Sequence, residues 1–532
     1  MMFIALVLCL GVALAERCVV PGALTLRPPA GMYHTNRQAV AQYLMRTNNV
    51  PIDDTLLYFQ GAASQARTPH ITTESLFRQE SNFLYMCQYQ FPFSVGVISA
   101  ECVVEMARVG NEVRAKSHLF VQKPSEHYAI WEGEPYTLEE LRERYQVDEV
   151  YWREDMEETI AGMGKTHVLT LPNVDLDLSE ARRPLRAMRR DQEQLLPGLQ
   201  AGRVVKNSGE LTLLRMASKV SALGGHQAAM LAGGNGGYSW EFQASTHFQA
   251  VTGACRQSRQ AYLTIAPAGA RTSILHYNDN LMEIVPEEND MILLDGGSEG
   301  EGGYGTDITR TWPVSGRFSK KQRAIYEAVL YAQDAAIAGL MSGASWRQIA
   351  GNSTWALLHK MKEIGLVHGS MEDLLRSGVS GTFMPHGLGH HVGIDVHDGG
   401  SREPLLEGMV LTVEPGLYFI NAVIERDLKD PNKAPYLNEA VINEYRAVGN
   451  SMGGVRIEDV MEITANGWDM LSSDAPRTVR DIEEFIASGV FHYDRKAHEA
   501  RCEAVLEELS AAYPEFAFPR AAVLGMLELP PQ

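Results

Sequence analysis

The chain has 532 residues, enough for two or three domains, and 45% of them are hydrophobic while 21% are charged, as in proteins with full cores. The formal net charge of −19 repels phosphate backbones, so nucleic acid is not an expected partner. The six cysteines form no Cys-x-x-Cys pair and no dense cluster, which argues against a zinc finger or a disulfide scaffold.

Residues 1–15 form an apolar run, MMFIALVLCLGVALA, that ends in small residues. The run is too short to span a bilayer and is typical of a secretory signal peptide, although it lacks the usual Lys or Arg at its start. It predicts a secreted or lumenal protein. A cytoplasmic location is the alternative if the run is a wrongly assigned start or a buried N-terminal strand. No other segment is long enough to be transmembrane.

Residues 16–200 alternate short apolar runs with helical patterns, which predicts an N-terminal α/β domain. Thr55–Phe59 has a strand pattern, and Thr137–Tyr145 has the pattern of an amphipathic helix. The segment Leu195–Ser208 carries a proline and turn formers but no apolar period, so we place the domain boundary near residue 200. We expect a helix to begin after it, with Ser208 as its N-cap.

Residues 201–490 are predicted to form a second domain, followed by a C-terminal extension, 491–532, for which the sequence suggests no function. Ser273–His276 is a short strand candidate. The polar segment 420–452 reads as a surface insertion that is helical in parts.

A predicted β-hairpin in this domain brings two carboxylates together. The segments 291–297 (MILLDGG) and 306–313 (TDITRTWP) have strand patterns and are joined by a Gly-rich loop. The first strand ends at Asp295 and the second begins at Asp307. The two side chains are therefore expected at one end of the ladder.

Helix and strand patterns alternate beyond this hairpin. Two capping-box patterns predict helices that begin at Ser319 and Ser345. Further along, Glu414 and Glu458 each lie in a strand candidate, and Pro415 biases Glu414 toward an extended backbone.

The segment from Gly381 to Asp398, GTFMPHGLGHHVGIDVHD, holds four of the 16 histidines. Glycines flank several of them, which suggests a backbone that approaches another group closely or adopts unusual dihedral angles. Any one of these histidines is more often a packing residue than a ligand. Their interpretation depends on which other side chains gather around them.

The candidate metal ligands are four carboxylates and one imidazole, each on or beside a predicted strand with glycines nearby: Asp295, Asp307, His390, Glu414 and Glu458. Four carboxylates in one pocket repel one another unless cations neutralise them. An oxygen-rich set with one imidazole suits Mn²⁺, and two ions roughly 3.5–4 Å apart are a common arrangement for hydrolysis. The alternative is that each acid is an ordinary turn or strand residue.

Four segments, DGG…TDITRTWP, MPHGLGHHVGIDVHD, GMVLTVEPGLY and GGVRIEDV, resemble in order the signature segments of the pita-bread metallopeptidases. The resemblance is closest to the Xaa-Pro dipeptidases (prolidases) and their relative aminopeptidase P, and it covers roughly residues 205–490. FRQES and YAIWEG extend it weakly into the N-terminal domain. It implies an N-terminal α/β domain followed by a pita-bread catalytic domain, a curved antiparallel sheet with flanking helices.

The resemblance also implies a role for each ligand in hydrolysis of the bond before proline. Asp295 binds one metal, His390 and Glu414 bind the other, and Asp307 and Glu458 bridge both. A hydroxide between the metals attacks the scissile carbonyl, and Glu414 handles the proton. Two Mn²⁺ ions are the expected cofactors, with an X-Pro peptide as substrate.

Further residues gain roles from the same resemblance. His386 faces the substrate and His397 stabilises the developing oxyanion. The substrate contacts that it implies are His276, Tyr262, Arg402, Arg456 and Trp131. Members of the family are usually dimers, so a homodimer is expected, with Trp131 covering the pocket.

Two features leave the substrate length open. The long spacer between Glu414 and Glu458 is more similar to prolidase than to aminopeptidase P. The segment 399–407, however, is shorter than the prolidase loop that supplies an Arg to the substrate carboxylate, and Arg402 is its only candidate. Prolidase activity is therefore the first expectation. The alternatives are aminopeptidase P activity on longer peptides and a metal-free pseudo-peptidase that serves as a binding module.

Overall fold

The computed structural model divides into two compact units that meet at Thr212 and Leu213, here called the N-terminal and C-terminal units. The residues that it describes are 28–63, 76–90, 99–125, 128–176, 180–284, 290–401, 403–447 and 451–512. The candidate signal peptide and the last 20 residues lie outside these ranges. No helix within them is both long enough and apolar enough to cross a membrane.

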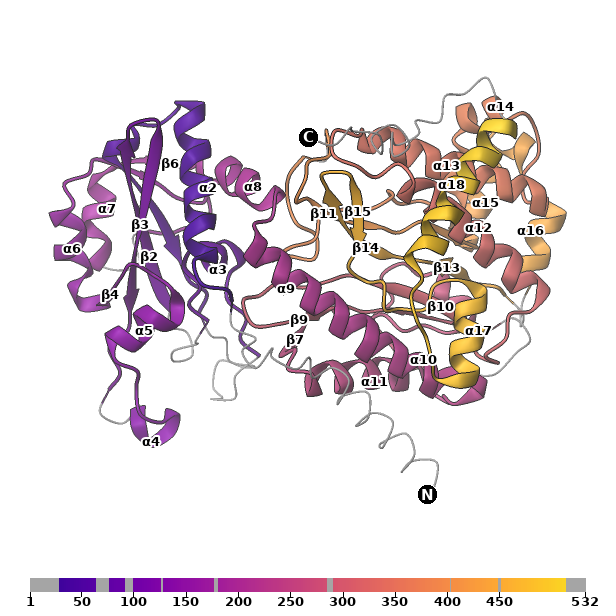
Figure 1. Ribbon diagram of the computed structural model, residues 1–532, viewed down its shortest axis with the longest axis horizontal. Coiled ribbons are helices and arrows are strands. Elements are labelled where there is room, and N and C mark those ends of the chain that lie inside the picture. The colour runs from indigo at the N-terminus through magenta and orange to yellow at the C-terminus, as the bar shows by residue number, and fades with distance from the viewer. Residues whose placement is uncertain are drawn as a thin grey trace, which may run out of the picture. The chain divides into compact units, whose positions relative to one another are not determined.

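The N-terminal unit contains a six-stranded mixed sheet with α6 and α7 on one face and α2 on the other (Figure 1). The order across the sheet is β4-β3-β2-β1-β5-β6, in which β2 pairs antiparallel with both neighbours and the other pairs are parallel. The strands are β1 (Thr55–Gln60), β2 (Ala100–Val109), β3 (Glu112–Val121), β4 (Glu149–Trp152), β5 (His167–Leu169) and β6 (Arg189–Asp191). The helices are α2 (Met32–Thr47), α3 (Ser81–Cys87), α4 (Tyr128–Glu132), α5 (Leu138–Tyr145), α6 (Met156–Gly162), α7 (Arg183–Ala187) and α8 (Leu195–Val204).

Patterns within a few neighbouring residues correctly predict two elements of this unit. β1 forms where the strand pattern predicts it, and Thr137 caps α5 with a complete capping box. The segment Leu195–Ser208 shows no apolar period in the sequence, yet α8 forms within it and buries Leu195 and Leu199. The helix that follows, α9 (Ser208–Lys219), has Asn207 rather than Ser208 as its N-cap, since the Asn207 side chain accepts hydrogen bonds from the first-turn amides.

A disulfide joins Cys87 at the end of α3 to Cys102 on β2. Both residues are fully buried, and the bond closes a loop of 15 residues in sequence. The sequence argues against a disulfide scaffold, and a single bond is not one. It does fix α3 against the central strands of the sheet.

The C-terminal unit is built on short strands, and every pair of them within the described residues is antiparallel. The strands are β7 (Arg259–Gln260), β8 (Met291–Asp295), β9 (Ser298–Glu299), β10 (Thr309–Pro313), β11 (Val410–Val413), β12 (Gly416–Tyr418), β13 (Gly454–Arg456), β14 (Asp459–Thr464) and β15 (Gly467–Met470). Single bridges join these strands to neighbouring segments, as Thr309 of β10 does with Glu458 at the β13–β14 junction. The predicted antiparallel sheet with flanking helices is confirmed.

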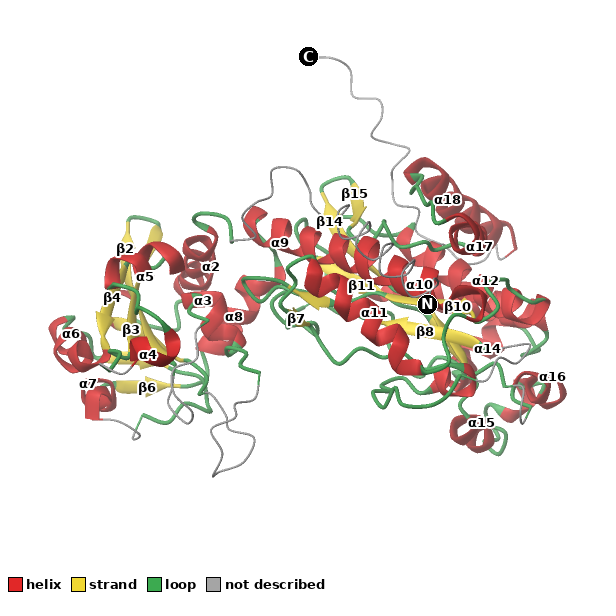
Figure 2. Ribbon diagram, turned by 90° about the horizontal axis from the view of Figure 1, so that it is seen from below, coloured by secondary structure: helices red, strands yellow, loops and turns green. Residues whose placement is uncertain are grey.

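Helices surround these strands in both views of the unit (Figures 1 and 2). Beyond α9, they are α10 (Gln227–Gly233), α11 (Glu241–Ala254), α12 (Lys320–Ile337), α13 (Trp346–Ile364), α14 (Met371–Ser377), α15 (Asn421–Asp427), α16 (Glu439–Tyr445), α17 (Val479–Ser488) and α18 (Arg495–Ala512). Ser319 and Ser345 cap α12 and α13, as their sequence patterns predict. A π-helical segment, Val220–His226, lies between α9 and α10.

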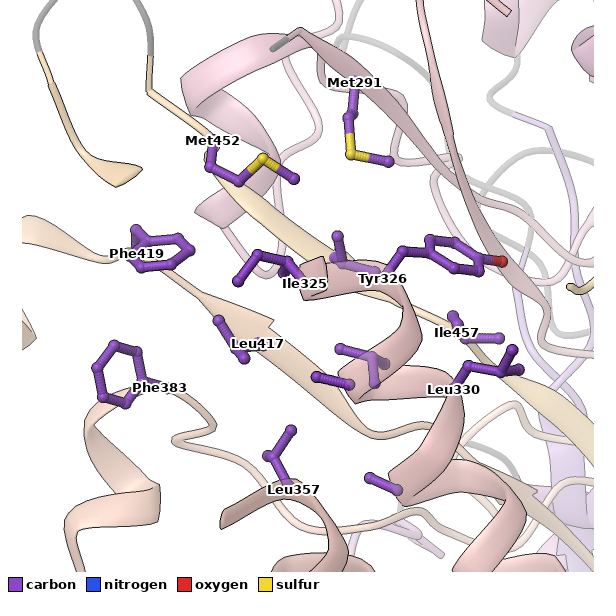
Figure 3. Close-up of a cluster of buried hydrophobic side chains, with 14 of the residues drawn as sticks. Met291, Ile325, Tyr326, Leu330, Leu357, Phe383, Leu417, Phe419, Met452 and Ile457 are labelled. Atoms are coloured by element: carbon purple, nitrogen blue, oxygen red, sulfur yellow. The ribbon is translucent and has the colours of Figure 1, made fainter. Parts of the chain in front are cut away.

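The core of the unit lies where α12 packs on the strands. Ile325 and Leu330 of α12 face Leu417 and Ile457 from the strand side, all of them buried in one cluster (Figure 3). The segment 420–452 is not a surface insertion alone, because Ile424 and Ile442 belong to the same cluster. The C-terminal extension also joins the core. Residues Val505, Leu506 and Leu509 of α18 are buried in this cluster.

Candidate metal centre

One pocket of the C-terminal unit, with a volume of about 250 Å³, is lined by all five predicted ligands. It gathers residues from β8, from the loops beside β10, β11 and β14, and from the histidine-rich segment. The lining residues are Leu275, His276, Asp295, Asp307, His386, Gly387, Gly389, His390, His397, Glu414, Arg456 and Glu458. Residues that are up to 183 positions apart in sequence therefore meet in one cavity.

The β8–β10 hairpin supplies two of the carboxylates. Asp295 is the last residue of β8 and pairs with Thr309, two residues after Asp307. The hydroxyl of Tyr262 lies 2.5 Å from Asp295 Oδ1 and 2.6 Å from Asp307 Oδ1, so it ties the two side chains together. Gly297 permits this turn, because a Cβ there would lie 1.7 Å from the Thr306 carbonyl oxygen.

The imidazole of His390 is oriented by the backbone around it. Its Nδ1 lies 3.0 Å from the His391 carbonyl oxygen and donates to it, which leaves the Nε2 lone pair facing the pocket. Nε2 lies 3.5 Å from Asp307 Oδ2 and 3.4 Å from Glu414 Oε1. Gly389 has the close approach that the sequence suggests, since a Cβ there would lie 2.1 Å from the Thr412 carbonyl oxygen. Gly387 has none.

Glu414 and Glu458 enter the pocket from breaks between strands. Glu414 follows β11, where Pro415 interrupts the run before β12, and Glu458 precedes β14. Oε2 of Glu458 accepts a hydrogen bond of 2.6 Å from the Thr309 hydroxyl. The other oxygen, Oε1, is buried and has no hydrogen-bond partner within the described residues.

Burial and mutual repulsion make ionisation of these acids unfavourable. Burial, together with the neighbouring Asp295 carboxylate, raises the pKa of Asp307 well above its usual value. Burial and Asp307 have the same effect on the pKa of Glu458. Burial also raises the pKa of Glu414. The pocket thus holds acids that resist ionisation unless positive charge is added.

Arg456 is the one permanently cationic side chain that lines the described pocket. Its NH2 group lies 2.5 Å from Asp295 Oδ2, and its Nε donates to the Thr309 hydroxyl oxygen at 3.1 Å. One guanidinium neutralises one carboxylate, so it does not balance four. A buried carboxylate oxygen without a partner and a lone pair aimed at carboxylates both fit divalent cations in this pocket.

Three further histidines line the same cavity. His386 is held by the Tyr418 hydroxyl at 2.9 Å, and burial lowers the pKa of this histidine to about 4, so its ring is neutral. His397 lies edge-on to His390, with ring centroids 4.3 Å apart. His276 is exposed at the pocket and lies in a loop, so the strand predicted over Ser273–His276 is wrong.

The sequence of this chain matches two protein-family models and is similar to known peptidases. Residues 213–465 match the model of metallopeptidase family M24, and residues 33–170 match that of the aminopeptidase P N-terminal domain. A probable Xaa-Pro aminopeptidase of Sordaria macrospora is 32% identical over 86% of this chain and 96% of its own length. The Xaa-Pro dipeptidase of Homo sapiens is 31% identical over 88% of this chain and 95% of its own length. The chain belongs to metallopeptidase family M24.

Solved structures agree with this assignment. Aminopeptidase PepP of Pseudomonas aeruginosa is 25% identical and covers 87% of this chain and 99% of its own, with a TM-score of 0.71. Zinc-substituted aminopeptidase P of E. coli in complex with product shares the fold, with 23% identity over 88% of this chain and 100% of its own and a TM-score of 0.71. The M24 protein is therefore a peptide hydrolase with an N-terminal domain and a pita-bread catalytic domain, and its family implies divalent metal ions.

Two predicted substrate contacts are not placed by the structure. Arg402 lies outside the described residues, and of Trp131 only the backbone, in α4, is described. Two supporting residues escaped the sequence analysis. Thr309 lies in the TDITRTWP segment and Tyr418 in the GMVLTVEPGLY segment, and neither has a role predicted from the sequence. Only the fold shows that both donate to groups in the pocket.

Proposed function

We propose that this M24 peptidase hydrolyses the peptide bond that precedes proline, most specifically in X-Pro dipeptides. The observation that carries the proposal is the convergence of four carboxylates and one imidazole in a single pocket. The names of its relatives, Xaa-Pro dipeptidase and Xaa-Pro aminopeptidase, support cleavage before proline. A tertiary X-Pro amide lacks the N–H that general peptidases bind, so a dedicated pocket is needed.

The proposed cofactors are two divalent ions, with Mn²⁺ favoured by the oxygen-rich donor set. Three overlapping groups of donor atoms support a shared site: Asp295 with Asp307 and Glu458, His390 with Glu414 and Glu458, and Asp307 with His390 and His397. When bound, such ions lower the pKa of water and polarise the scissile carbonyl group.

The side chains of this chain then position the substrate and move protons. Glu414, a partly buried carboxylate with a raised pKa, is suited to accept a proton and pass it to the leaving proline nitrogen. The neutral His386 ring lines the pocket with both nitrogens engaged, Nδ1 donating to the Gly387 carbonyl oxygen and Nε2 accepting from the Tyr418 hydroxyl, so it would shape the substrate side of the pocket. His397 and His276 line the pocket as candidate donors to the developing oxyanion and to the substrate.

A direct test is hydrolysis of a small X-Pro panel with added Mn²⁺, against a chelated control. Release of proline from Gly-Pro, restored by Mn²⁺ after chelation, is the expected result. No hydrolysis of any X-Pro peptide under metal-replete conditions would refute the proposal. Metal analysis of the purified protein counts the ions. A protein without bound metal or metal-dependent activity would instead be the pseudo-peptidase binding module.

Aminopeptidase P activity is the second candidate. It is favoured by the similarity to probable Xaa-Pro aminopeptidases and by the short segment 399–407, which leaves Arg402 as the one local Arg for a dipeptide carboxylate. Comparing Gly-Pro with a longer X-Pro peptide separates the two activities. A preference for the longer peptide by kcat/KM would assign aminopeptidase P activity.

The proposed location is secreted or lumenal, with a homodimer as the working form and no nucleic-acid partner. Residues 1–15 and the buried Cys87–Cys102 disulfide support an oxidising compartment. N-terminal sequencing of the protein from its natural source would reveal cleavage near Ala15. An uncleaved N-terminus and reduced cysteines would favour the cytoplasm. Sedimentation analysis determines the oligomeric state.

A further inference from the structure

Gln333 is a residue of α12. Its side-chain amide hydrogen-bonds to the backbone next to two acids of the pocket, Glu414 and Glu458. The side chain is fully buried. Its Nε2 lies 3.0 Å from the Val413 carbonyl oxygen, 3.2 Å from the Ile457 carbonyl oxygen and 3.0 Å from Asp459 Oδ2. Its Oε1 accepts a hydrogen bond of 2.6 Å from NH1 of Arg477. Both ends of the amide are therefore satisfied, and its orientation is fixed.

The two carbonyl groups immediately precede Glu414 and Glu458 in sequence. They lie at the break between two ladders: β11 pairs with β14 up to Val413 and Asp459, while β12 pairs with β13 from Gly416 and Arg456. Glu414 and Glu458 lie outside these two ladders, and their backbone N–H groups donate instead to the carbonyl oxygens of Leu388 and Thr309. The Gln333 side chain, from α12, hydrogen-bonds to the backbone on both sides of this break.

We propose that Gln333 is a positioning residue of the metal centre, which holds the backbone of β11 and of the β13–β14 junction so that Glu414 and Glu458 face a common ion. The inference rests on the proposed role of these acids as ligands. Ligand atoms of Glu414, Glu458 and His390 lie within 4.8 Å of one another, a spacing that a small shift of either strand would change. Groups that orient metal ligands without touching the metal commonly affect metal affinity in this way.

The competing explanation is that Gln333 is only one more buried hydrogen-bonding group. Two variants and a control on the same helix separate these roles. Gln333→Met keeps the volume but removes both N–H donors and the acceptor for Arg477. Gln333→Glu keeps the acceptor for Arg477 and replaces the donor that faces the strands. Tyr326→Phe is the control, because the buried Tyr326 hydroxyl donates to the Arg477 carbonyl oxygen at 2.6 Å and has no hydrogen bond to the two strands.

The full-length proteins are first stripped of metal and then titrated with Mn²⁺ by calorimetry. Thermal unfolding is measured with and without the metal. All three substitutions are expected to lower the Tm of the metal-free protein. Only the two Gln333 variants are expected to weaken Mn²⁺ affinity, by about 10- to 100-fold. With Co²⁺ as a probe, their visible absorption should differ from that of wild type, whereas Tyr326→Phe should retain the wild-type spectrum.

The outcomes distinguish this inference from the proposed function. Wild-type protein that binds no Mn²⁺ would overturn the metal site itself. Wild-type affinity and an unchanged Co²⁺ spectrum in Gln333→Met would leave the metal site intact and refute the positioning role. Gln333→Glu carries the same test if Gln333→Met does not fold, because the carboxylate retains its partner Arg477. Equal loss of affinity in Tyr326→Phe would also refute it, since a general loss of packing would then suffice.

Discussion

The C-terminal unit holds two groups of acids with little exposure to solvent, and their chemistry differs. The pocket acids, defined as Asp295, Asp307, Glu414 and Glu458, share one lining arginine, Arg456. The network acids, Asp334 and Asp459, contact a larger set of cations. Asp459 accepts from NH2 of Arg310 at 2.6 Å, and Asp334 pairs with Arg477 and Arg501, each at 2.7 Å.

The pKa shifts of Asp307, Glu414 and Glu458 have the opposite sign to those of Asp334 and Asp459. Burial opposes ionisation of Asp334, but Arg477, His498 and Arg501 outweigh it and hold its pKa below the usual value. Arg310 and Arg477 likewise outweigh burial for Asp459 and lower its pKa. In the pocket, burial and repulsion prevail and raise the pKa of Asp307.

This difference shows what each group needs. The network acids find their counterions within the chain, so they are structural. Arg310 illustrates this, because it is fully buried and also donates to the backbone carbonyl oxygens of Glu458 and Pro476. Of the pocket acids, Asp295 has Arg456 as its partner, but this one guanidinium does not balance the other three carboxylates, and a buried unpaired charge is expensive. The charge that balances them must therefore come from outside the chain, and substitutions should have different effects in the two groups.

Asp307→Asn should have the largest effect. It removes a carboxylate that faces both Asp295 and His390, so metal-dependent hydrolysis should fall by roughly a thousand-fold or more, equivalent to about 4 kcal/mol of transition-state stabilisation. Steady-state kinetics with saturating Mn²⁺ measures the change. Glu301→Gln, in the same hairpin loop but outside the pocket lining, is the control and should retain activity. Retained activity in Asp307→Asn would remove this residue from the metal centre.

Asp459→Asn should lower the stability of the protein more than Asp307→Asn does. It leaves Arg310 buried beside a neutral amide, which should lower the free energy of unfolding by about 3 kcal/mol. Asp307→Asn in the metal-free protein removes a repelled acid and should cost little or no stability. Urea unfolding of both metal-free variants measures the contrast. Equal destabilisation by the two substitutions would show that the pocket acids are as well compensated as the network acids.

The pH dependence of the metal-free protein follows from the same shifts. Because the folded-state pKa values of Asp307 and Glu458 are raised, these acids bind more protons in the folded than in the unfolded state. Their contribution to stability is present below the unfolded pKa of about 4 and is lost as pH rises through the folded pKa values. Metal binding displaces those protons, so the metal-induced rise in Tm should be larger at about pH 8 than at about pH 5.

Thermal unfolding with and without Mn²⁺ at the two pH values tests this directly. Asp334 provides the internal contrast, because its lowered pKa makes its contribution present above the unfolded value and lost only on acidification. A metal-induced shift that does not change with pH would contradict the raised pKa values of the pocket acids.

The two groups also differ in how far the sequence predicts them. The pocket acids were identified because each lies in a short segment with its own signals, such as the Gly-rich turn after Asp295 and the Pro that follows Glu414. The network could not be found in this way. Arg310 sits inside a motif without any local sign of its partner Asp459, which lies 149 positions away. Gln333 lies in an ordinary amphipathic helix, and its partners are up to 144 positions away.

Helix ends show the same limit on a smaller scale. The patterns at Ser319 and Ser345 are local, and both predict the N-cap correctly, although the reciprocal capping box forms only at Ser319. Asn207 was missed as the cap of α9 because the adjacent Ser208 is an equally good candidate by residue type. The helical α8 was missed because Gly198 and Gly202 weaken its pattern. In the fold, both glycines lie against Val40 of α2, where a Cβ would be 3.0–3.4 Å away.

The smallest expected effect lies at the outer end of the network. Arg501 of α18 is 32% exposed, and its Nε pairs with Asp334 at 2.7 Å. In Arg501→Ala, Asp334 keeps its buried partner Arg477, and solvent screens the lost pair, so the free energy of unfolding should fall by only about 1 kcal/mol. Lys496→Ala, an exposed cation on the same helix, is the matched control and should change stability less. Mn²⁺ affinity should stay at the wild-type value in both variants, because Arg477, which contacts Gln333, is retained. If Arg501→Ala instead weakens metal binding as much as Gln333→Met, the ion pairs and the ligand strands respond as one unit, and the division between structural and pocket acids fails.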